Sequence, residues 1–451
     1  MSDKFIIEGG NQLHGQIDVK GSKNAATPII AATLLTKEPC ILSNIPLIED
    51  VLNMINLVQS LGAKVTWLDE RKVKIEAKDI DPSKIDRKLV SRMRSSILVL
   101  GPLLARCGYI ELNHPGGCVI GTRSVKTHLD AFEDLGAKVE VIQVGSSFDH
   151  PYTEPTKYSE KTNLYSLKID NDDVDGGDIV LDEFSVTGTE NILMACALFP
   201  KKHVIKIAAS EPHVQELVMF LKKMGVNIEG GGTSTIEISG KKKLSGVDHF
   251  ISYDSVEAGT YILMASAVGG EVEVGNVPVE YMDLFFKKLR DFGANIEILK
   301  NESVLVKTPK NLRIDKIQAL PYPGIPTDLQ SVFGVLSTQA QGLTLIHDPL
   351  YDGRLKYLEE LNKMGAEIII CDPHRAVING PTELYGTELG PLDLRSGAAL
   401  IIAGLLAKGS TVIRNASQVD RGYEKIEERL QKIGANVKRI SPALVEVSDK
   451  K

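Results

Sequence analysis

Six segments of the chain repeat one pattern of apolar and polar positions. In each, an apolar residue is followed by Gly, then Ala or Val, one polar residue, and Val or Ile. The glycines are 74, 89, 68, 72 and 69 residues apart, and they are Gly62, Gly136, Gly225, Gly293, Gly365 and Gly434. A repeat this regular over the whole chain predicts six copies of one supersecondary unit.

The pattern around each glycine predicts a helix followed by strands. In the first copy Val51, Met54, Ile55 and Val58 follow the i, i+3, i+4, i+7 spacing of an amphipathic helix. The glycine then stands where a helix C-terminus favours a left-handed residue. A strand follows, and alternating apolar positions over 73–77 predict a second strand.

A second helix, rich in Ala and Leu, and a further strand complete each unit. Such helices are expected at 25–35, 95–105, 191–198 and 397–407. A unit of two helices and about four strands, repeated six times, is too large for one core, so the pattern predicts an α/β protein with two domains of three units. The polar segment 145–168, which lengthens the second unit, is predicted to be a surface insertion.

Composition narrows the range of partners and locations. The chain has 451 residues, 43% hydrophobic, and a net charge of −7, so no basic excess points to nucleic acid or an anionic membrane. We see no signal-peptide pattern and no apolar run of the roughly 18 residues that span a membrane. The five cysteines are scattered and form no Cys-x-x-Cys pair, which favours a reducing, cytoplasmic setting.

Reactive side chains gather where helices are expected to begin. Those ahead of the Ala/Leu-rich helices are Lys23, Asn24, Arg94, Ser185, Asp254, Asp328, Asp393 and Arg395. Those ahead of the helices that end in the repeated glycines are Arg123, Arg354 and Arg421. Helix N-termini attract anions, so these cations predict a pocket for a small polyanion with phosphate and carboxylate groups.

Each of these residues also has a structural explanation. Asp254 and Ser185 fit helix N-caps, and Asp328 fits either a cap or a general base. Asp393 and Arg395 could form a surface ion pair of little energetic weight. No histidine spacing supports a metal site, and no Gly-x-Gly-x-x-Gly or Walker loop supports a nucleotide cofactor.

One loop carries a candidate reactive thiol. The segment His114-Pro-Gly-Gly-Cys-Val-Ile-Gly-Thr-Arg123 places Cys118 behind two glycines and five residues before a guanidinium group. Glycines allow backbone conformations that other residues resist, and a nearby cation favours the thiolate. Taken alone, the segment fits an ordinary turn better than a reactive site.

Together these motifs resemble the UDP-N-acetylglucosamine 1-carboxyvinyltransferase family of the EPSP synthase superfamily, over essentially the whole chain. The matching segments begin with Gly21-Ser-Lys-Asn-Ala25, Met93-Arg-Ser-Ser96, Pro115-Gly-Gly-Cys-Val-Ile-Gly-Thr-Arg123 and Ser185-Val-Thr-Gly-Thr-Glu-Asn191. They continue with Glu257-Ala-Gly-Thr260, Pro326-Thr-Asp-Leu-Gln330, Asp393-Leu-Arg-Ser-Gly397 and Asp420-Arg-Gly-Tyr-Glu424.

The resemblance implies a two-domain inside-out α/β barrel of six repeats, three per domain with pseudo-threefold symmetry, helices inside and sheets outside. One domain would span 23–252 and carry the cysteine loop. The other would join 1–22 to 253–451 and carry the base. The active site would lie in the cleft between the domains.

The implied reaction moves the enolpyruvyl group of phosphoenolpyruvate to the 3′-hydroxyl of UDP-N-acetylglucosamine by addition and elimination, in peptidoglycan synthesis. By resemblance, Cys118 is the proton donor, can form a covalent adduct with phosphoenolpyruvate, and is the target of fosfomycin. Asp328 resembles the base on the 3′-hydroxyl. The resemblance implies no cofactor, no metal, no nucleic acid and no membrane partner, and it leaves the oligomeric state open, with a monomer allowed.

The remaining site residues are likewise assigned by resemblance. Lys23, Arg123 and Arg421 would bind phosphate, and Arg354 and Arg395 would face the carboxylate or stabilise the closed cleft. The sugar nucleotide would contact a larger set, consisting of Asn24, Arg94, Arg123, Ser124, Val125, Lys126, Thr127, Glu183, Phe184, Ser185, Val186 and Leu350.

The chain departs from the family pattern in places. Ser124-Val-Lys126 stands where Pro, any residue and Asp are usual, and Ser255 stands where Arg is usual. One alternative is 3-phosphoshikimate 1-carboxyvinyltransferase, which shares the repeats and phosphoenolpyruvate chemistry but lacks the Pro-Gly-Gly-Cys loop. Another is a non-catalytic sugar-nucleotide-binding paralogue, which the presence of Cys118, Asp328 and Lys23 disfavours.

Overall fold

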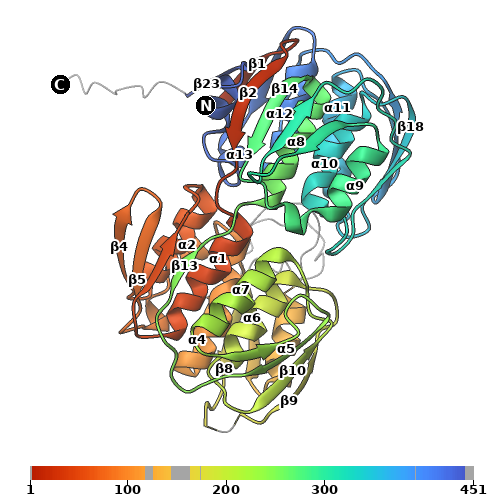
Figure 1. Ribbon diagram of the computed structural model, residues 1–451. Coiled ribbons are helices and arrows are strands. Elements are labelled where there is room, and N and C mark those ends of the chain that lie inside the picture. The colour runs from red at the N-terminus through yellow and green to blue at the C-terminus, as the bar shows by residue number, and fades with distance from the viewer. Residues whose placement is uncertain (1–2, 117–124, 144–162, 173, 392, 442–451) are drawn as a thin grey trace, which may run out of the picture. The chain divides into compact units, whose positions relative to one another are not determined.

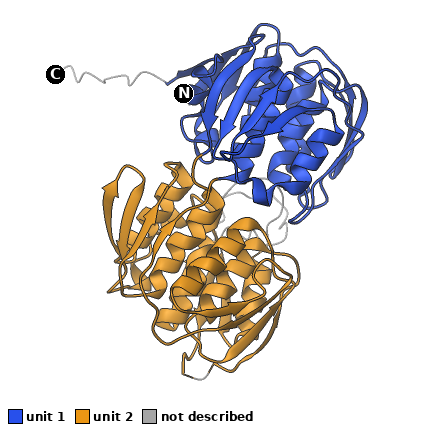
Figure 2. Ribbon diagram, in the orientation of Figure 1, with its two compact units in different colours: residues 1–19, 119–122, 254–451 blue, residues 20–118, 123–253 orange. Residues whose placement is uncertain are grey.

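The structure is a computed structural model (Figure 1), and it describes residues 3–116, 125–143, 163–172, 174–391 and 393–441. These residues divide into two compact units (Figure 2). Unit 1 contains the described residues of 1–19 and 254–441, and unit 2 contains those of 20–253.

Unit 2 mixes helices and strands, and its described residues lie between residues 20 and 253. Its helices are α1 (Lys23–Ala32), α2 (Glu49–Ser60), α3 (Arg87–Val90), α4 (Leu100–Cys107), α5 (Lys126–Asp134), α6 (Val186–Cys196) and α7 (Pro212–Lys223), with 3₁₀ turns η1 (Thr33–Leu35), η2 (Pro82–Lys84) and η3 (Arg94–Val99). Its strands are β3 (Cys40–Ser43), β4 (Lys64–Asp69), β5 (Lys72–Glu76), β6 (Tyr109–Asn113), β7 (Lys138–Gln143), β8 (Asn163–Lys168), β9 (Gly177–Val180), β10 (Lys202–Lys206), β11 (Asn227–Glu229), β12 (Thr235–Ser239) and β13 (Asp248–Phe250).

Unit 1 combines the first two strands of the chain with its C-terminal half. Its helices are α8 (Ser255–Val268), α9 (Asp283–Asp291), α10 (Thr327–Ser337), α11 (Tyr357–Lys363), α12 (Leu394–Leu406), α13 (Ser417–Asp420) and α14 (Ile426–Gln431), with 3₁₀ turns η5 (Val279–Tyr281) and η6 (Arg354–Lys356). Its strands are β1 (Lys4–Glu8), β2 (Leu13–Asp18), β14 (Gly270–Gly275), β15 (Asn295–Ile298), β16 (Val304–Lys307), β17 (Lys316–Gln318), β18 (Gly342–His347), β19 (Glu367–Asp372), β20 (Arg375–Gly380), β21 (Glu388–Leu389), β22 (Ser410–Arg414) and β23 (Asn436–Ile440).

The described strands form six small sheets with one common plan. The strand after each repeated glycine lies at a sheet edge and pairs antiparallel with its neighbour. In five sheets the opposite edge is a parallel pair, and the orders are β13-β3-β5-β4, β11-β12-β10-β9, β15-β16-β14-β2, β17-β18-β20-β19 and β21-β22-β1-β23. The sixth, β6-β8-β7, has three described strands and no parallel pair among them.

Two strands, β2 and β13, are exchanged between the units, in the sense that each pairs in one unit while the helix that follows it belongs to the other. β2 leads along the chain into α1 of unit 2, yet it pairs in parallel with β14 of unit 1. β13 leads into α8 of unit 1, yet it pairs in parallel with β3 of unit 2. Elsewhere, as in β17-α10-β18 and β9-α6-β10, the strand before an Ala/Leu-rich helix pairs with the strand after it.

The predicted surface insertion at 145–168 is wrong for its last six residues. Asn163–Lys168 form β8, the central strand of the sheet β6-β8-β7, and Tyr165 and Leu167 are buried. The apolar side chains of Tyr165 and Leu167 alternate along an extended backbone and cover the core, which the polar character of the preceding residues obscures. Residues 145–162 lie outside the described residues.

The Ala/Leu-rich helices form the centre of each unit, and the sheets lie outside them. In unit 1, α8, α10 and α12 pack against one another (Figure 1). Every residue of α12 from Leu394 to Leu405 is buried, which requires a helix that is apolar on all sides. In unit 2, α4 packs on α6, and both contact η3. The two-domain α/β fold expected from the sequence is therefore confirmed.

The repeated glycines adopt the backbone conformation that the pattern predicts. All six have positive φ, from +85° at Gly293 to +109° at Gly62. A Cβ atom is strained in this region, so glycine ends each helix at little cost. Each glycine directs the chain into the following edge strand.

Candidate functional site

In unit 1, one carboxylate is held between two buried guanidinium groups. Asp328, in the first turn of α10, accepts hydrogen bonds from Arg354 Nη2 at 2.6 Å and from Arg395 Nε at 3.0 Å. The arginine side chains are each 3% exposed, whereas that of Asp328 is 26% exposed. Charged hydrogen bonds on both oxygens fix the orientation of the carboxylate.

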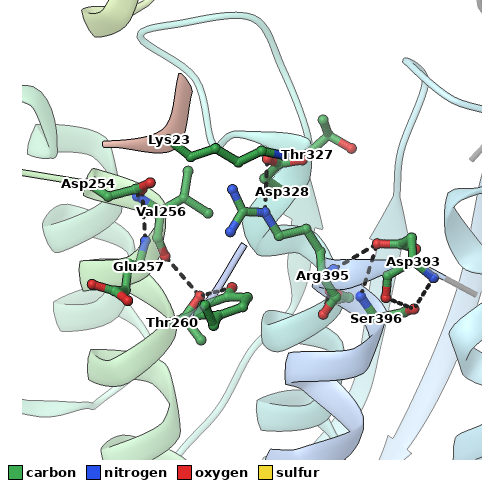
Figure 3. A network of polar contacts seen from close by, with 12 residues as sticks. Lys23, Asp254, Val256, Glu257, Thr260, Thr327, Asp328, Asp393, Arg395 and Ser396 are labelled. Carbon is green, nitrogen blue, oxygen red and sulfur yellow. Dashed lines mark hydrogen bonds and ion pairs between the residues drawn. The ribbon is translucent and has the colours of Figure 1, made fainter. Parts of the chain in front are cut away.

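The start of α12 fixes Arg395. Asp393 caps the helix by accepting from the amides of Arg395 and Ser396, and Ser396 Oγ accepts from the amide of Asp393, which completes a capping box (Figure 3). The alternative that Asp393 and Arg395 form a surface ion pair is wrong, because both residues are buried and the Arg395 side chain binds Asp328 instead.

Arg395 keeps one donor unused. Its Nη1 is buried and has no hydrogen-bond partner within the part of the chain that the structure describes. Burial acts to lower the pKa of Arg395, but Tyr423, Asp328 and Asp254 outweigh this and raise it above its ordinary value. The guanidinium is therefore a permanent cation with an N–H to offer, which suits an anionic ligand.

Arg354 is fixed by a second group of acceptors. Its Nε donates to Thr327 Oγ1 at 3.1 Å, and Thr327 in turn donates to Asp348 at 2.5 Å. Burial opposes the charge, but Asp328, Asp393 and Asp348 outweigh it and raise the pKa of Arg354. Leu350 lies two residues after Asp348, and its backbone amide donates to Asp348 Oδ1 at 3.0 Å. The residue is 39% exposed.

Arg421 does not begin a helix, contrary to the prediction. It is the C-cap of α13, and α14 starts five residues later at Ile426. A short turn containing Gly422 and Tyr423 separates the two helices. The place of Arg421 ahead of the repeated Gly434 therefore reflects the repeat, but it does not predict the local structure at Arg421.

In unit 2, the start of α1 carries Lys23 and Asn24. Ser22 caps this helix by accepting from the amide of Ala25, and the backbone amide of Ser22 bonds to the carbonyl of Ser252. Lys23 Nζ lies 2.9 Å from Asp50 Oδ2, and the Lys23 side chain is 15% exposed. A partly buried ammonium group held at a helix start can bind an anion without large rearrangement.

The residues predicted to contact the sugar nucleotide begin three neighbouring elements of unit 2. Arg94 is the first residue of η3, Val125 is the N-cap of α5, and Val186 is the first residue of α6. Ser185 caps α6 by accepting from the amide of Gly188, and Asp254 caps α8. Both cap interpretations are thereby confirmed, and α6 starts five residues before the predicted helix 191–198.

The polar side chains at the start of α5 bind carboxylates of the same unit. Thr127 Oγ1 donates to Glu183 Oε1 at 3.3 Å. Lys126 bonds Asp130 and also lies 3.2 Å from Asp182. Phe184 lies in the same loop and is 54% exposed. The unusual Lys126 is therefore accommodated by carboxylates of its own unit.

Three predicted site residues, Cys118, Arg123 and Ser124, lie outside the described residues. Sequence reasoning missed several residues that the structure places in the polar clusters, including Asp50, Thr327, Asp348 and Tyr423. Thr327 and Tyr423 had a signal, since they belong to the motifs that contain Asp328 and Arg421. The four other cysteines, Cys40, Cys107, Cys196 and Cys371, are free thiols.

The described residues contain neither a candidate metal centre nor a candidate membrane span. No cluster of three or more His, Cys, Asp or Glu side chains could hold a metal ion in this part of the chain. Nor is any helix within the described ranges both long enough and apolar enough to cross a membrane.

Comparison with known proteins gives matches along nearly the whole chain. The model of the family described as EPSP synthase (3-phosphoshikimate 1-carboxyvinyltransferase) matches residues 7–149 and 155–430. UDP-N-acetylglucosamine 1-carboxyvinyltransferase of Treponema denticola is 40% identical over 441 residues, which cover 96% of this chain and 98% of that protein. The protein of the same name in Coxiella burnetii is 40% identical over 439 residues, which cover 97% and 96% of the two chains.

Solved structures show the same fold at low sequence identity. The enolpyruvyl transferase NikO from Streptomyces tendae superposes with a TM-score of 0.85 at 22% identity and covers 98% of this chain and 99% of its own. EPSP synthase from Acinetobacter baumannii gives a TM-score of 0.71 at 17% identity, covering 98% of this chain and 100% of its own. The chain therefore belongs to the EPSP synthase family and, within it, to the UDP-N-acetylglucosamine 1-carboxyvinyltransferases.

Proposed function

We propose that this protein transfers the enolpyruvyl group of phosphoenolpyruvate to the 3′-hydroxyl of UDP-N-acetylglucosamine and releases phosphate, as a step of peptidoglycan synthesis. The observation that carries the proposal is the Asp328 carboxylate between Arg354 and Arg395, with one Arg395 donor unused by the described residues. The names of relatives that are 40% identical over nearly the whole chain support the two substrates.

The proposed addition step needs one acid and one base. Asp328 takes the proton of the 3′-hydroxyl, whose oxygen then bonds the central carbon of phosphoenolpyruvate. Cys118 donates a proton to the methylene carbon, which becomes a methyl group. Arg354 and Arg395 keep the Asp328 carboxylate in one orientation, so that a lone pair of a fixed oxygen can accept the proton.

The proposed elimination reverses the carbon protonation and breaks a different bond. The bond between the central carbon and the phosphate oxygen breaks, the methyl group returns a proton to the Cys118 thiolate, and the proton held by Asp328 leaves with phosphate. Lys23, Arg123, Arg421 and the Nη1 donor of Arg395 would stabilise the charge on phosphate and carboxylate. The products are the enolpyruvyl ether and phosphate, and no cofactor is required.

Phosphate release tests the proposal directly. We expect release from phosphoenolpyruvate when UDP-N-acetylglucosamine is added and none when shikimate 3-phosphate is added. Equal release with shikimate 3-phosphate would assign the chain to the related activity, and binding of UDP-N-acetylglucosamine without release would indicate a non-catalytic paralogue.

The role proposed for Cys118 has its own test. Fosfomycin should label the wild-type chain covalently and add its mass to the peptide that contains Cys118. Cys118→Ser should abolish the labelling, whereas Cys371→Ser, at an exposed free thiol, should leave it unchanged. Labelling of Cys118→Ser would place the reactive thiol elsewhere. We also propose a cytoplasmic location, which the four free cysteines of the described residues support.

A further inference from the structure

We propose that Asn191, acting through His128, is a positioning residue that holds together the three segment starts of the sugar-nucleotide half of the site. This inference rests on the proposed function, because it takes UDP-N-acetylglucosamine as the ligand of those segment starts. Neither residue belongs to the predicted contacts, and both are buried, with 1% and 2% exposure.

Asn191 uses both ends of its side-chain amide on other elements. Its Oδ1 accepts from the amide of Gly101 in α4 at 3.0 Å. Its Nδ2 donates to the carbonyl of Ile97 in η3 at 2.9 Å and to His128 Nδ1 in α5 at 3.0 Å. One side chain of α6 therefore joins η3, α4 and α5, at separations of 63 to 94 residues along the chain.

The bonds of Asn191 determine the tautomer of His128. Because Nδ2 of Asn191 is a donor, Nδ1 of His128 must accept, and the proton of a neutral ring then lies on Nε2. Nε2 is 3.1 Å from Thr187 Oγ1, which can accept that proton. His128 thus connects the second helical residue of α6 to Asn191, about one turn further along the same helix.

The ring stays neutral in this environment. Burial and, to a smaller extent, the positive charge of Arg94 lower the pKa of His128 to about 3. A charged ring carries a proton on both nitrogens, so His128 Nδ1 could no longer accept a hydrogen bond. Two donors, Asn191 Nδ2 and His128 Nδ1, would then point at each other. The network is consequently a fixed set of neutral hydrogen bonds at ordinary pH.

The elements that this network joins are those whose first residues form the predicted sugar-nucleotide contacts. Arg94 begins η3, Lys126 and Thr127 begin α5, and Val186 begins α6. Their mutual spacing decides whether they can contact one ligand simultaneously, and errors of about 1 Å at such contacts are costly. Breaking the network should therefore weaken binding of the sugar nucleotide while leaving the Arg354–Asp328–Arg395 group intact.

Two variants and one control test the inference. Asn191→Leu keeps the approximate volume and removes all three hydrogen bonds, and His128→Phe keeps a ring and removes two. His203→Phe is the control, because His203 is also a buried histidine of unit 2, at 1% exposure, and its Nε2 has no partner in the described part of the chain. Titration calorimetry with UDP-N-acetylglucosamine measures Kd, and steady-state kinetics measure KM for each substrate.

We expect Asn191→Leu and His128→Phe to raise the Kd and KM for UDP-N-acetylglucosamine about tenfold or more, with KM for phosphoenolpyruvate changed less than about twofold. His128→Gln, whose amide can bond both neighbours, should restore part of the affinity. His203→Phe should bind normally. If Asn191→Leu does not fold, His128→Phe and His128→Gln decide the question.

Two results would overturn the inference. One is wild-type affinity in both His128→Phe and the folded Asn191→Leu; the other is an equal loss in His203→Phe, which would show a general effect of buried substitutions. If the wild-type chain itself does not bind UDP-N-acetylglucosamine, the proposed function fails and this inference fails with it. The calorimetry therefore separates the two failures.

Discussion

The Asp328 carboxylate is held in place by two arginines that are distant along the chain. Arg354 lies 26 residues from Asp328 and donates to Oδ1, whereas Arg395 lies 67 residues away and donates to Oδ2. Removing one partner of a buried ion pair costs about 3–5 kcal/mol, because the remaining charge is left without compensation. Each of the three residues is therefore constrained by the other two, and a substitution at any of them disturbs all three.

Replacing Asp328 with Asn tests its role as base. Asn keeps the shape and one hydrogen-bond acceptor but cannot take a proton at neutral pH. We expect kcat to fall about 10²–10⁴-fold, the usual contribution of a general base. UDP-N-acetylglucosamine binding by calorimetry should persist, and Asp315→Asn, at an exposed position of the same unit, should leave kcat unchanged. Retained kcat in Asp328→Asn would remove this residue from the proton transfer.

His128 should make the folded protein sensitive to acid. Its pKa is about 3 in the folded chain against about 6.5 in an unfolded one, so between these values the unfolded chain binds more protons. The free energy of unfolding therefore decreases as pH falls from about 6.5 towards 3, and the stabilisation is fully present above about 6.5. His128→Gln should lose less stability between about pH 7 and about pH 5 than the wild type in urea denaturation. His14→Gln, at an exposed site, should match the wild type; equal pH dependence in all three would contradict the argument.

Among helices, strands and turns, the local sequence was sufficient to predict the features that depend only on neighbouring residues. The six glycines, the caps Ser185 and Asp254, and the buried Ala/Leu-rich helices follow from backbone sterics and apolar periodicity. The partners of Asp328 and Asn191 could not be predicted, because hydrogen bonds over 26 to 94 residues depend on packing that no window of sequence contains. The strand β8 was missed because the polar residues before it hide its short alternating pattern.

Two of the repeated glycines differ in their surroundings and give a matched test. Gly136 has φ of +97°, and a Cβ there would meet no atom of the described residues within 4 Å, whereas a Cβ at Gly62 would lie 2.5 Å from the carbonyl oxygen of Asp79. Gly136→Ala should cost about 1–2 kcal/mol of unfolding free energy from backbone strain alone. Gly62→Ala should cost more, since the Asp79 carbonyl must also move. Denaturant titration compares them, and equal losses would show that strain alone determines the cost.

For the whole molecule, the pairing of β2 and β13 determines which residues each unit must include to complete its sheets. The described residues between 20 and 253 all belong to unit 2, and β13 at the end of this range completes the sheet with β3. β13 also carries His249, whose Nε2 bonds the buried Glu216 at 2.9 Å. A boundary drawn before β13 would therefore expose the edge of β3 and leave a buried carboxylate without its partner.

Two fragments test this dependence. Residues 20–253 should be soluble and unfold cooperatively by circular dichroism, because the described core of this unit spans Ala25 to Ile251. Residues 20–246, which lack β13, should be destabilised by several kcal/mol or fail to fold. Glu216→Gln in the longer fragment provides an intermediate, since it keeps the shape at the His249 contact. Equal stability of the two fragments would show that β13 adds nothing to the unit.

The exchange of β2 also sets the order in which the protein can be completed during synthesis. β2 begins at Leu13, but its partner β14 begins only at Gly270, 257 residues later. At ribosomal rates of about 5–20 residues per second, β2 waits about 10–50 s for that partner. Unit 2 can fold during this interval, whereas unit 1 must wait for the C-terminal half. The nascent chain thus carries an unpaired strand for most of its translation, and chaperones that bind exposed strands have a defined period in which to act.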